Sequence, residues 1–408
     1  MNFCTKAFLF LFLLSSAAGS YAASPPSDMP LLQASGTDIV DSTGKPLVLT
    51  GINLGGWLVE EPWMEPFVTN PPAGSAFAPI KDHVTLWGTV EQRFGVDGRE
   101  KVRTAFRDAW ITEADFKRMH DLGFNVVRLP FLASLVTEPN GFHWLDQAIA
   151  WASENHIYVI LDMHGAPGSQ SDQDHTGQEG LNQFFKDHSN VLKAEAVWTE
   201  IAARYHGNTA VAGYDMLNEP MGTPNSDTLY VIEDQLYRAI RAGDPTHLIF
   251  IEDGYTGVQW MPIPGPVGWT NVVYSTHYYN FTAKSAADQQ GTLDSYTASV
   301  DKERQRRNIP FYVGEYCVEP NGTPDELTGF VQNLIAKHIS STIWTYKVSM
   351  TRGGQSFWGL YSNANAIAPL DFYTDSEADL MTKCNEIRTE NLDLNSNEQA
   401  AFQKALQH

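Results

Sequence analysis

Residues 211–220 have the sequence VAGYDMLNEP, an apolar run that closes on Asn218 and Glu219. A second apolar run, PFYVG at residues 310–314, is followed directly by Glu315. Short apolar runs that end in polar residues are typical of buried parallel strands entering a loop. When two such strands belong to one barrel, the residues at their carboxyl ends lie on the same face. The sequence therefore predicts two glutamates side by side at one end of a barrel.

Eight short apolar segments rich in β-formers recur along the chain, and helical patterns lie between most of them. The expected strands are residues 47–53, 125–130, 158–164, 211–218, 248–253, 272–277, 311–315 and 342–347. The expected helices are residues 113–122, 144–155, 181–205, 227–242, 293–307 and 325–338. Alternating strands and helices indicate a parallel sheet with right-handed crossovers, and eight repeats predict closure into an α/β fold, the (β/α)8 TIM barrel. The connection at residues 254–271 is rich in Gly and Pro, so no full helix is expected there.

The segments outside these repeats are expected to belong to the same single domain, residues 31–408. Residues 37–49 predict an N-terminal β-hairpin that turns at residues 41–44. Residues 61–108 form a long insertion after the first strand, and we expect this insertion to cover one side of the barrel mouth.

The N-terminal segment has the features of a secretory signal peptide. Lys6 precedes an apolar run at residues 7–14, and small residues lead to an expected cleavage site near Ala22. The run is too short to span a bilayer, and no later segment reaches about 18 apolar residues. We therefore expect residues 1–22 to be removed and the mature protein to act as a secreted monomer, in the extracellular space or the periplasm.

The formal net charge of the chain is −21. Nucleic acids and anionic membranes attract basic surfaces, so this charge argues against both as partners. An acidic, well-solvated surface is compatible with an exported enzyme that acts on a neutral polymer.

Cysteine and histidine spacing gives little sign of a metal site. Cys317 and Cys384 remain after signal removal, and in an oxidising compartment they either form a disulfide or stay as two buried thiols. A metal site would have to come from His164, His175, Asp162, Asp172 and Asp174. These histidines lack the close spacing that metal sites favour, so neither a metal nor another cofactor is expected.

Polar or aromatic residues stand at the predicted ends of six strands. They are Arg128, His164, Asn218 with Glu219, His277 with Tyr279, Glu315 and Trp344. Each alone has a structural explanation, such as a buried histidine with a satisfied hydrogen bond. Six on one rim favour an active site, because barrel enzymes build their sites at this face.

A pair of carboxyl groups is what cleavage of a glycosidic bond requires. One group must donate a proton to the leaving oxygen, and the other must stay ionised to attack the sugar or to activate water. Arg128 beside Glu315 would favour the ionised form, and Tyr279 would donate a hydrogen bond to it. Asn218 would bind the 2-hydroxyl of the sugar, and Trp344 would form a platform under the reacting ring.

The segments around these residues resemble glycoside hydrolase family 5, the cellulase family, and most closely its exo-β-1,3-glucanase branch. The motifs are GINLGGWLVEEPWM at 51–64, VRLP at 127–130, DMHGAPGSQ at 162–170, LNEP at 217–220, HYY at 277–279, VGEY at 313–316 and WTYK at 344–347. They follow the order of the family along almost the whole mature chain.

The resemblance implies a retaining enzyme in which Glu219 is the acid/base and Glu315 the nucleophile. It places around them the side chains of Arg128, His164, Asn218, His277 and Tyr279. It also implies that Glu61 holds the non-reducing terminal sugar. Two motifs depart from the branch, which usually has WSWKTE where this chain has WTYKVS from Trp344 onward, and GEW where this chain has Tyr316.

The expected function is that of a secreted retaining β-glucan hydrolase, an exo-β-1,3-glucanase (glucan 1,3-β-glucosidase) that acts on polysaccharide or oligosaccharide by double displacement. Because the two motifs depart, an endo-acting β-1,4-glucanase (cellulase) or β-1,6-glucanase of the same family stays open as the alternative. A barrel that binds glycan without cutting it is a third reading, against which the presence of both glutamates argues.

Overall fold

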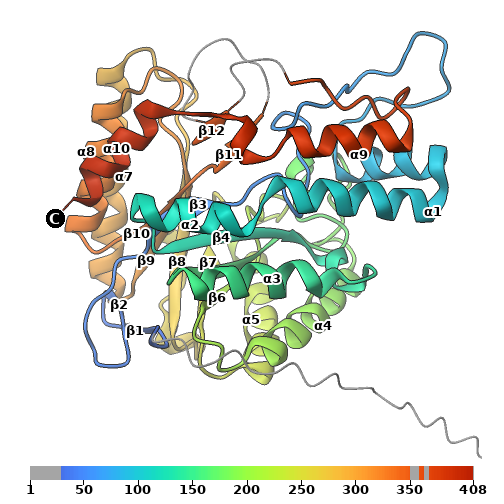
Figure 1. The fold of residues 1–408 in the computed structure, drawn as a ribbon. Coiled ribbons are helices and arrows are strands. Elements are labelled where there is room, and N and C mark those ends of the chain that lie inside the picture. The colour runs from blue at the N-terminus through green and yellow to red at the C-terminus, as the bar shows by residue number, and fades with distance from the viewer. Residues whose placement is uncertain (1–28, 350–357, 363–366, 408) are drawn as a thin grey trace, which may run out of the picture.

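The computed structural model describes residues 29–349, 358–362 and 367–407 (Figure 1). Eight parallel strands close into a barrel in the order β10-β3-β4-β5-β6-β7-β8-β9. They are β3 (Thr50–Asn53), β4 (Val126–Leu132), β5 (Tyr158–Gly165), β6 (Val211–Asp215), β7 (Leu248–Glu252), β8 (Val272–Tyr278), β9 (Phe311–Tyr316) and β10 (Ser340–Ile343). Every residue of these strands is buried, as expected when helices cover a parallel sheet. The chain is therefore the predicted (β/α)8 barrel.

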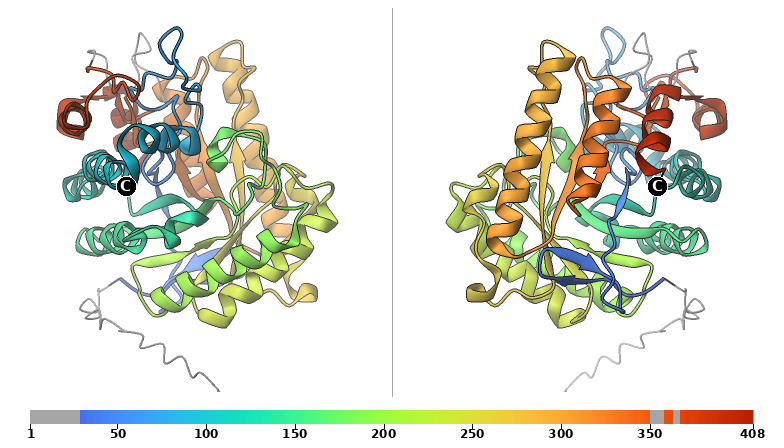
Figure 2. Two further views of the ribbon diagram at one scale, coloured as in Figure 1. Left: turned by 90° about the vertical axis from the view of Figure 1, so that its right-hand side faces the viewer. Right: turned by 90° about the vertical axis from the view of Figure 1, so that its left-hand side faces the viewer.

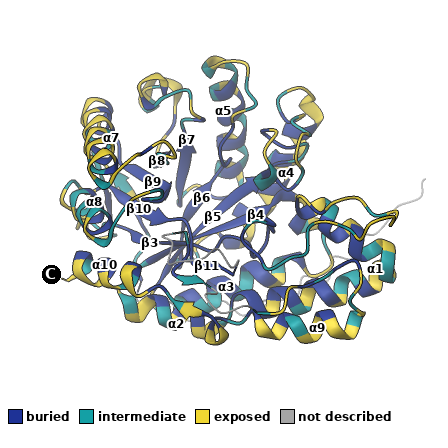
Figure 3. Cartoon of the chain, turned by 90° about the horizontal axis from the view of Figure 1, so that it is seen from above, coloured by how far each residue is buried: buried dark blue, intermediate teal, exposed yellow. Residues whose placement is uncertain are grey.

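Helices surround the barrel and turn their buried faces toward it, as the view from above shows (Figure 3). They are α1 (His83–Trp110), α2 (Glu113–Leu122), α3 (Gly141–Glu154), α4 (His188–Tyr205), α5 (Ser226–Gly243), α6 (Pro264–Val267), α7 (Ala286–Arg307), α8 (Pro324–Ala336), α9 (Glu377–Glu386) and α10 (Ser396–Leu406). Asp82, Thr323 and Ser376 begin three of them with capping boxes, which satisfy the free N–H groups of the first turn. The β7–β8 connection holds only the four-residue α6 and a 3₁₀ turn, in agreement with its Gly/Pro-rich sequence.

The N-terminal hairpin begins earlier than the sequence predicted. The expected turn at residues 41–44 is present, but the regular strands are β1 (Gln33–Ser35) and β2 (Asp38–Val40). Gly36 has φ of 58°, a conformation that glycine adopts freely, and it makes the tight turn between them. Figure 2 shows this hairpin at one end of the barrel. Its apolar side chains pack against the first residues of the strands, among them Val126, Tyr158 and Leu248. The hairpin thus closes the amino end, and the carboxyl end is left for the site.

The insertion after β3 is a long helix whose apolar residues join the main core of the barrel. α1 bends at Gly95, where φ is 72°, and packs beside α9 along one side of the barrel (Figures 1 and 3). Glu60 anchors it, because its carboxylate accepts a hydrogen bond of 3.0 Å from the Trp87 indole and pairs with His83. Glu60, the first of the two adjacent glutamates, therefore has a structural role.

The eighth strand is shorter than predicted. β10 ends at Ile343, and the chain then turns across the barrel toward β11 (Lys347–Val348), which pairs with β12 (Tyr361–Ser362) and, through it, with β13 (Asp393–Leu394). The Thr345 hydroxyl donates to the Asn53 carbonyl at 2.9 Å and holds the chain in this new direction. Trp344 consequently lies just past the strand, over the barrel end.

Cys317 and Cys384 are both buried and no disulfide joins them, so the disulfide alternative is wrong. Within the described chain, no helix has the length and apolar character needed to cross a bilayer. The expected signal peptide at residues 1–22 lies outside the described residues.

Candidate active site

The carboxyl ends of the strands bring the two predicted glutamates together. Glu315 lies in β9 and Glu219 lies four residues past β6, and both side chains are almost fully buried. Glu219, His277 and Glu315 each contribute one oxygen or nitrogen atom to a group in which all three atoms lie within 4.8 Å of one another. Carboxyl groups of retaining glycosidases lie about 5–5.5 Å apart, and those of inverting enzymes about 6.5–9.5 Å. The spacing therefore suits direct attack by one carboxylate better than a water held between the two.

Glu315 is held by donors on both of its oxygens. Arg128 Nη1 donates to Oε1 at 2.8 Å, and the Tyr279 hydroxyl donates to Oε2 at 2.7 Å. His277 Nδ1 lies 3.6 Å from Oε2. Hydrogen bonds from a cation and a hydroxyl stabilise a carboxylate in its ionised form and fix its orientation, which is the state a nucleophile needs. The contacts with Arg128 and Tyr279 are those that the sequence predicted.

Glu219 stands in a different electrostatic setting. Its backbone is in the left-handed region, with φ of 40°, which is uncommon for a residue with a side chain and occurs often at functional sites. His277 Nδ1 lies 2.8 Å from Oε1, the Tyr255 hydroxyl donates to Oε1 at 2.6 Å, and His175 Nδ1 lies 3.6 Å from Oε2. Burial acts to raise the pKa of Glu219, but the hydrogen bond from His277 and the charges of His175 and His277 outweigh it and lower this pKa.

Arg128 is the centre of a buried charge network. It lies in the middle of β4, not at the end of the strand as predicted, and it is fully buried. Besides Glu315 it contacts three further carboxylates. They are Asp215 at 2.9 Å, Asp162 at 3.1 Å and Glu252 at 3.1 Å. One guanidinium cannot neutralise four carboxylates, so protons must be shared among them. Burial raises the pKa of Asp162 strongly despite the opposing charge of Arg128.

The residues expected to bind sugar line the same end. The Asn218 Oδ1 accepts from Arg128 at 2.8 Å, whereas its buried Nδ2 has no hydrogen-bond partner among the described residues. His164 Nδ1 forms a hydrogen bond of 2.7 Å with Asp162 Oδ2. Burial lowers the pKa of His164 far below its usual value, so the ring is neutral. Trp344 stacks on that ring at 5.3 Å with an interplanar angle of 11°. A buried donor without a partner, beside a flat aromatic surface, suits a polar ligand that carries hydroxyl groups.

Glu61 lies within electrostatic reach of both glutamates of the pair. Its Oε2 accepts from the Trp63 indole at 2.8 Å, and its buried Oε1 has no hydrogen-bond partner within the described residues. Burial raises the pKa of Glu61 well above its usual value, and the charges of Asp174, Glu315 and Glu219 add to this. The structure thus brings Glu61 to the rim with one oxygen available.

Three contributors were missed by the sequence reasoning, and a fourth was considered only as a metal ligand. Glu252, Asp215 and Tyr255 each contact a member of the site, and so does His175, which was named only for a possible metal site. Asp215 and Glu252 had a signal, because a charged residue inside an otherwise apolar strand is rare without a partner. Tyr255 lies in a turn and His175 in a short 3₁₀ helix, and nothing in the local sequence pattern indicates where these segments fold.

The atoms of Glu219, His277 and Glu315 are close enough to surround a cation, and they form the one such group within the described ranges. Each is already hydrogen-bonded, to Tyr255, Tyr279, Arg128 or another member of the group. His164 and His175, which the sequence analysis considered for a metal site, do not belong to any group of this kind in the described part of the chain. The bonding pattern fits acid–base chemistry better than metal ligation.

Comparisons with known proteins agree with this geometry. A family model described as cellulase (glycosyl hydrolase family 5) matches residues 88–349. A beta-xylosidase of Phanerodontia chrysosporium is 32% identical over 292 residues, which cover 69% of this chain and 57% of that protein. A probable glucan 1,3-beta-glucosidase A of Aspergillus niger is 32% identical over 245 residues, which cover 58% of this chain and 56% of that protein. The chain spans little more than half the length of these relatives.

Solved structures share the barrel at low sequence identity. A rutinosidase from Aspergillus niger has a TM-score of 0.60 and 18% identity, and the match covers 76% of this chain and 95% of that one. A beta-glucanase from Saccharophagus degradans has a TM-score of 0.54 and 16% identity, with coverage of 87% and 92%. At this identity the likeness shows the fold alone.

Proposed function

This chain belongs to glycosyl hydrolase family 5, and we propose that it is a retaining β-glucanase that releases glucose from the ends of β-1,3-glucan. The observation that carries the proposal is the close approach of Glu219 and Glu315, each held by a different set of donors. Two carboxyl groups in unlike settings are what a double displacement requires, because one must attack while the other transfers a proton.

In the first step Glu315 attacks the anomeric carbon of the terminal glucose. The glycosidic C–O bond breaks, its electron pair passes to the leaving oxygen, and Glu219 protonates that oxygen. In the second step Glu219 takes a proton from water, and the resulting hydroxide displaces Glu315 and gives a sugar with its original anomeric configuration. Arg128 and Tyr279 stabilise the Glu315 carboxylate when it leaves.

The proton for the leaving oxygen is shared between Glu219 and His277. The charges of Glu252 and Glu315 raise the pKa of His277 strongly, although its burial acts to lower it. At 2.8 Å the two side chains titrate as one unit, so the proton can rest on the imidazole and move to Glu219 when the leaving oxygen develops charge. This arrangement reconciles the low pKa of Glu219 in the free protein with its role as an acid.

Aromatic rings beside the pair support a sugar as the substrate. Tyr279 stacks on Phe281 at 5.4 Å and 9°, and Trp358 stacks on Tyr279 at 5.9 Å and 26°. Phe281 is 63% exposed, and it stacks on Trp358 as well, so the three rings form one aromatic surface next to Glu315. Sugar rings stack on faces of this kind through their C–H groups.

The linkage and the site of attack are the finer part of the proposal. Relatives named glucan 1,3-beta-glucosidase support β-1,3-glucan, and the Glu61 Oε1, which has no hydrogen-bond partner among the described residues, supports a role in binding the hydroxyls of a terminal glucose. The motifs that depart at Trp344 and Tyr316 keep the endo-acting β-1,4 or β-1,6 alternative open. We further propose export by the N-terminal segment and action as a monomer.

The test is a panel of glucans with different linkages, followed by NMR of the first product. Early release of β-glucose from a β-1,3-glucan is expected, because retention conserves the β configuration before mutarotation. Longer oligosaccharides as the early products would support the endo-acting alternative. An α-anomer would refute double displacement, and glycan binding without any hydrolysis would point to a non-catalytic barrel.

A further inference from the structure

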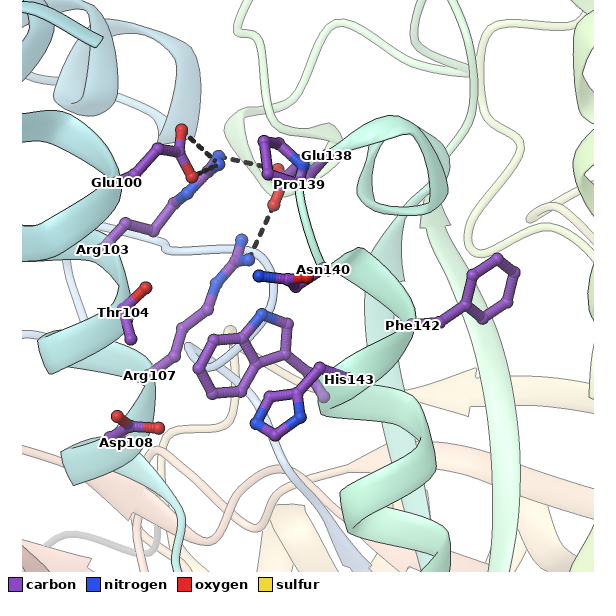
Figure 4. Close-up of a pocket in the computed structure, with 11 residues that line it drawn as sticks. Glu100, Arg103, Thr104, Arg107, Asp108, Glu138, Pro139, Asn140, Phe142 and His143 are labelled. Carbon is purple, nitrogen blue, oxygen red and sulfur yellow. Dashed lines mark hydrogen bonds and ion pairs between the residues drawn. The ribbon is translucent and has the colours of Figure 1, made fainter. Parts of the chain in front are cut away.

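The hollow between α1 and α3, of about 550 Å³, lies away from the glutamate pair (Figure 4). Its arginines are committed to neighbouring carboxylates. Arg103 pairs with Glu100 and Glu138 at 2.6 and 2.8 Å, and Arg107 pairs with Glu138 at 2.7 Å. Both arginines that line this hollow thus have a carboxylate partner, and Nε and Nη2 of Arg107 have no hydrogen-bond partner among the described residues.

Glu252, at the end of β7, is instead in contact with several groups of the site. Its Oε2 accepts from the backbone N–H of Glu219 at 2.8 Å. Its Oε1 lies 3.1 Å from Arg128 Nη2 and 3.2 Å from His277 Nε2. The carboxyl group is 3% exposed, so water does not compete for these contacts. One buried carboxyl group therefore joins the acid/base, its histidine partner and the arginine of the nucleophile.

The contact with the Glu219 N–H has a specific consequence for backbone geometry. A residue with φ of 40° sits in a sparsely populated region, and such a conformation persists only when its surroundings hold it. The N–H of Glu219 points at Glu252 Oε2 in that conformation. If this bond were lost, the peptide would be free to relax toward a commoner conformation and to swing the Glu219 carboxyl away from the glycosidic oxygen.

We propose that Glu252 is a positioning residue that holds Glu219 and His277 in the geometry needed for proton transfer to the leaving group. The inference rests on the proposed function, since it assigns a supporting role in that reaction. Glu252 need not touch the substrate. Its effect falls on the proton transfers of Glu219, to the leaving oxygen in the first step and from water in the second.

Charged groups surround Glu252 from every neighbouring element. Burial raises the pKa of Glu252 to about 8, His277 and Arg128 oppose this, and Asp215 of β6 adds to it. Glu233 of α5 lies behind it, and burial together with the charge of Glu252 raises the pKa of Glu233. The Glu219 N–H and Arg128 both donate hydrogen bonds to Glu252, and His277 Nε2 lies 3.2 Å from it, so a neutral amide in its place would turn an N–H₂ group toward one of these groups.

The test compares two substrates in the Glu252→Gln variant. A disaccharide such as laminaribiose has a poor leaving group and needs the proton, whereas 2,4-dinitrophenyl β-glucoside departs without one. We expect kcat/KM for laminaribiose to fall more than tenfold and kcat/KM for the aryl glucoside to change less than threefold. Equal losses on both substrates, or no loss on either, would overturn the proposal.

A matched control keeps these outcomes distinct from misfolding and from failure of the proposed function. Glu398→Gln changes a buried glutamate of α10 whose side chain bonds Asn395, remote from the pair, and should leave both rates unchanged. If Glu252→Gln does not fold, Glu252→Asp withdraws the carboxylate by one methylene and should show the same selective loss. Wild-type protein that hydrolyses neither substrate would refute the proposed function itself.

Discussion

Removing the Tyr255 hydroxyl is the sharpest test of the acid/base assignment. In Tyr255→Phe the ring stays, but the 2.6 Å hydrogen bond to Glu219 Oε1 is lost. This bond favours the ionised form of Glu219, so its loss raises the pKa of Glu219. The protonated form then persists to higher pH, and the basic limb of the kcat/KM profile is expected to move upward.

The size of the shift follows from the strength of the bond. A hydrogen bond to a charged group contributes about 1.5–3 kcal/mol, and one pKa unit corresponds to about 1.4 kcal/mol. The Tyr255 ring is 53% exposed, so water can replace part of the lost bond. The lower end of the range therefore applies, which predicts a shift of about one pH unit. The apparent value belongs to the coupled Glu219–His277 unit.

The assay is kcat/KM for an aryl β-glucoside with a poor leaving group, measured across the pH range. The control is Tyr230→Phe in α5, whose hydroxyl lies 3.4 Å from Thr256 and makes no bond to Glu219. Its profile should coincide with that of the wild type. A basic limb that stays in place in Tyr255→Phe, or moves to lower pH, would refute Glu219 as the group that must be protonated.

Four other variants test the remaining assignments. Glu315→Gln should abolish turnover while calorimetry still detects glycan binding. Glu219→Ala should keep activity only on glucosides with good leaving groups. If both variants behave alike toward aryl glucosides, the assignments of nucleophile and acid are wrong. Glu61→Ala should cut laminari-oligosaccharide hydrolysis about tenfold, since a buried sugar hydroxyl left without its partner costs about 1–3 kcal/mol. A full rate would point to an open, endo-acting site. Arg128→Met should lower the free energy of unfolding, measured by urea titration, by about 3–5 kcal/mol, because four buried carboxyl groups lose their cation. Unchanged stability would show that these carboxyl groups are already neutral.

Much of the barrel could be predicted from the sequence because its elements are defined by local patterns. Helix α2 begins and ends at the predicted residues 113 and 122, and β5 extends only one residue further than expected. The errors occur where a long-range contact overrides the local pattern. The segment after Ile343 reads as continued strand, but bonds from Thr345 to the β3 end turn it away.

The candidate site divides in the same way. Glu219, Glu315, Arg128, His277 and Tyr279 could be named from the sequence, because a parallel barrel brings its strand ends together whatever their separation along the chain. The electrostatic roles of these residues could not be predicted from the sequence. The pKa of Glu219 depends on Tyr255 and His175, and the proton balance depends on Glu252, all of which are brought there by loops and strands distant in sequence.

The sequence by itself determined the eight-fold alternation and which polar residues stand at one rim, since periodicity and burial are properties of neighbouring residues. The tertiary structure alone decided that four carboxylates share Arg128 and that Glu219 adopts a left-handed backbone. It also decided that Asn218 and Glu61 each have one polar atom without a hydrogen-bond partner among the residues that the structure describes. The physical reason is that hydrogen bonds and charges act through space over a few ångströms, and only the folded chain sets which groups meet at that distance.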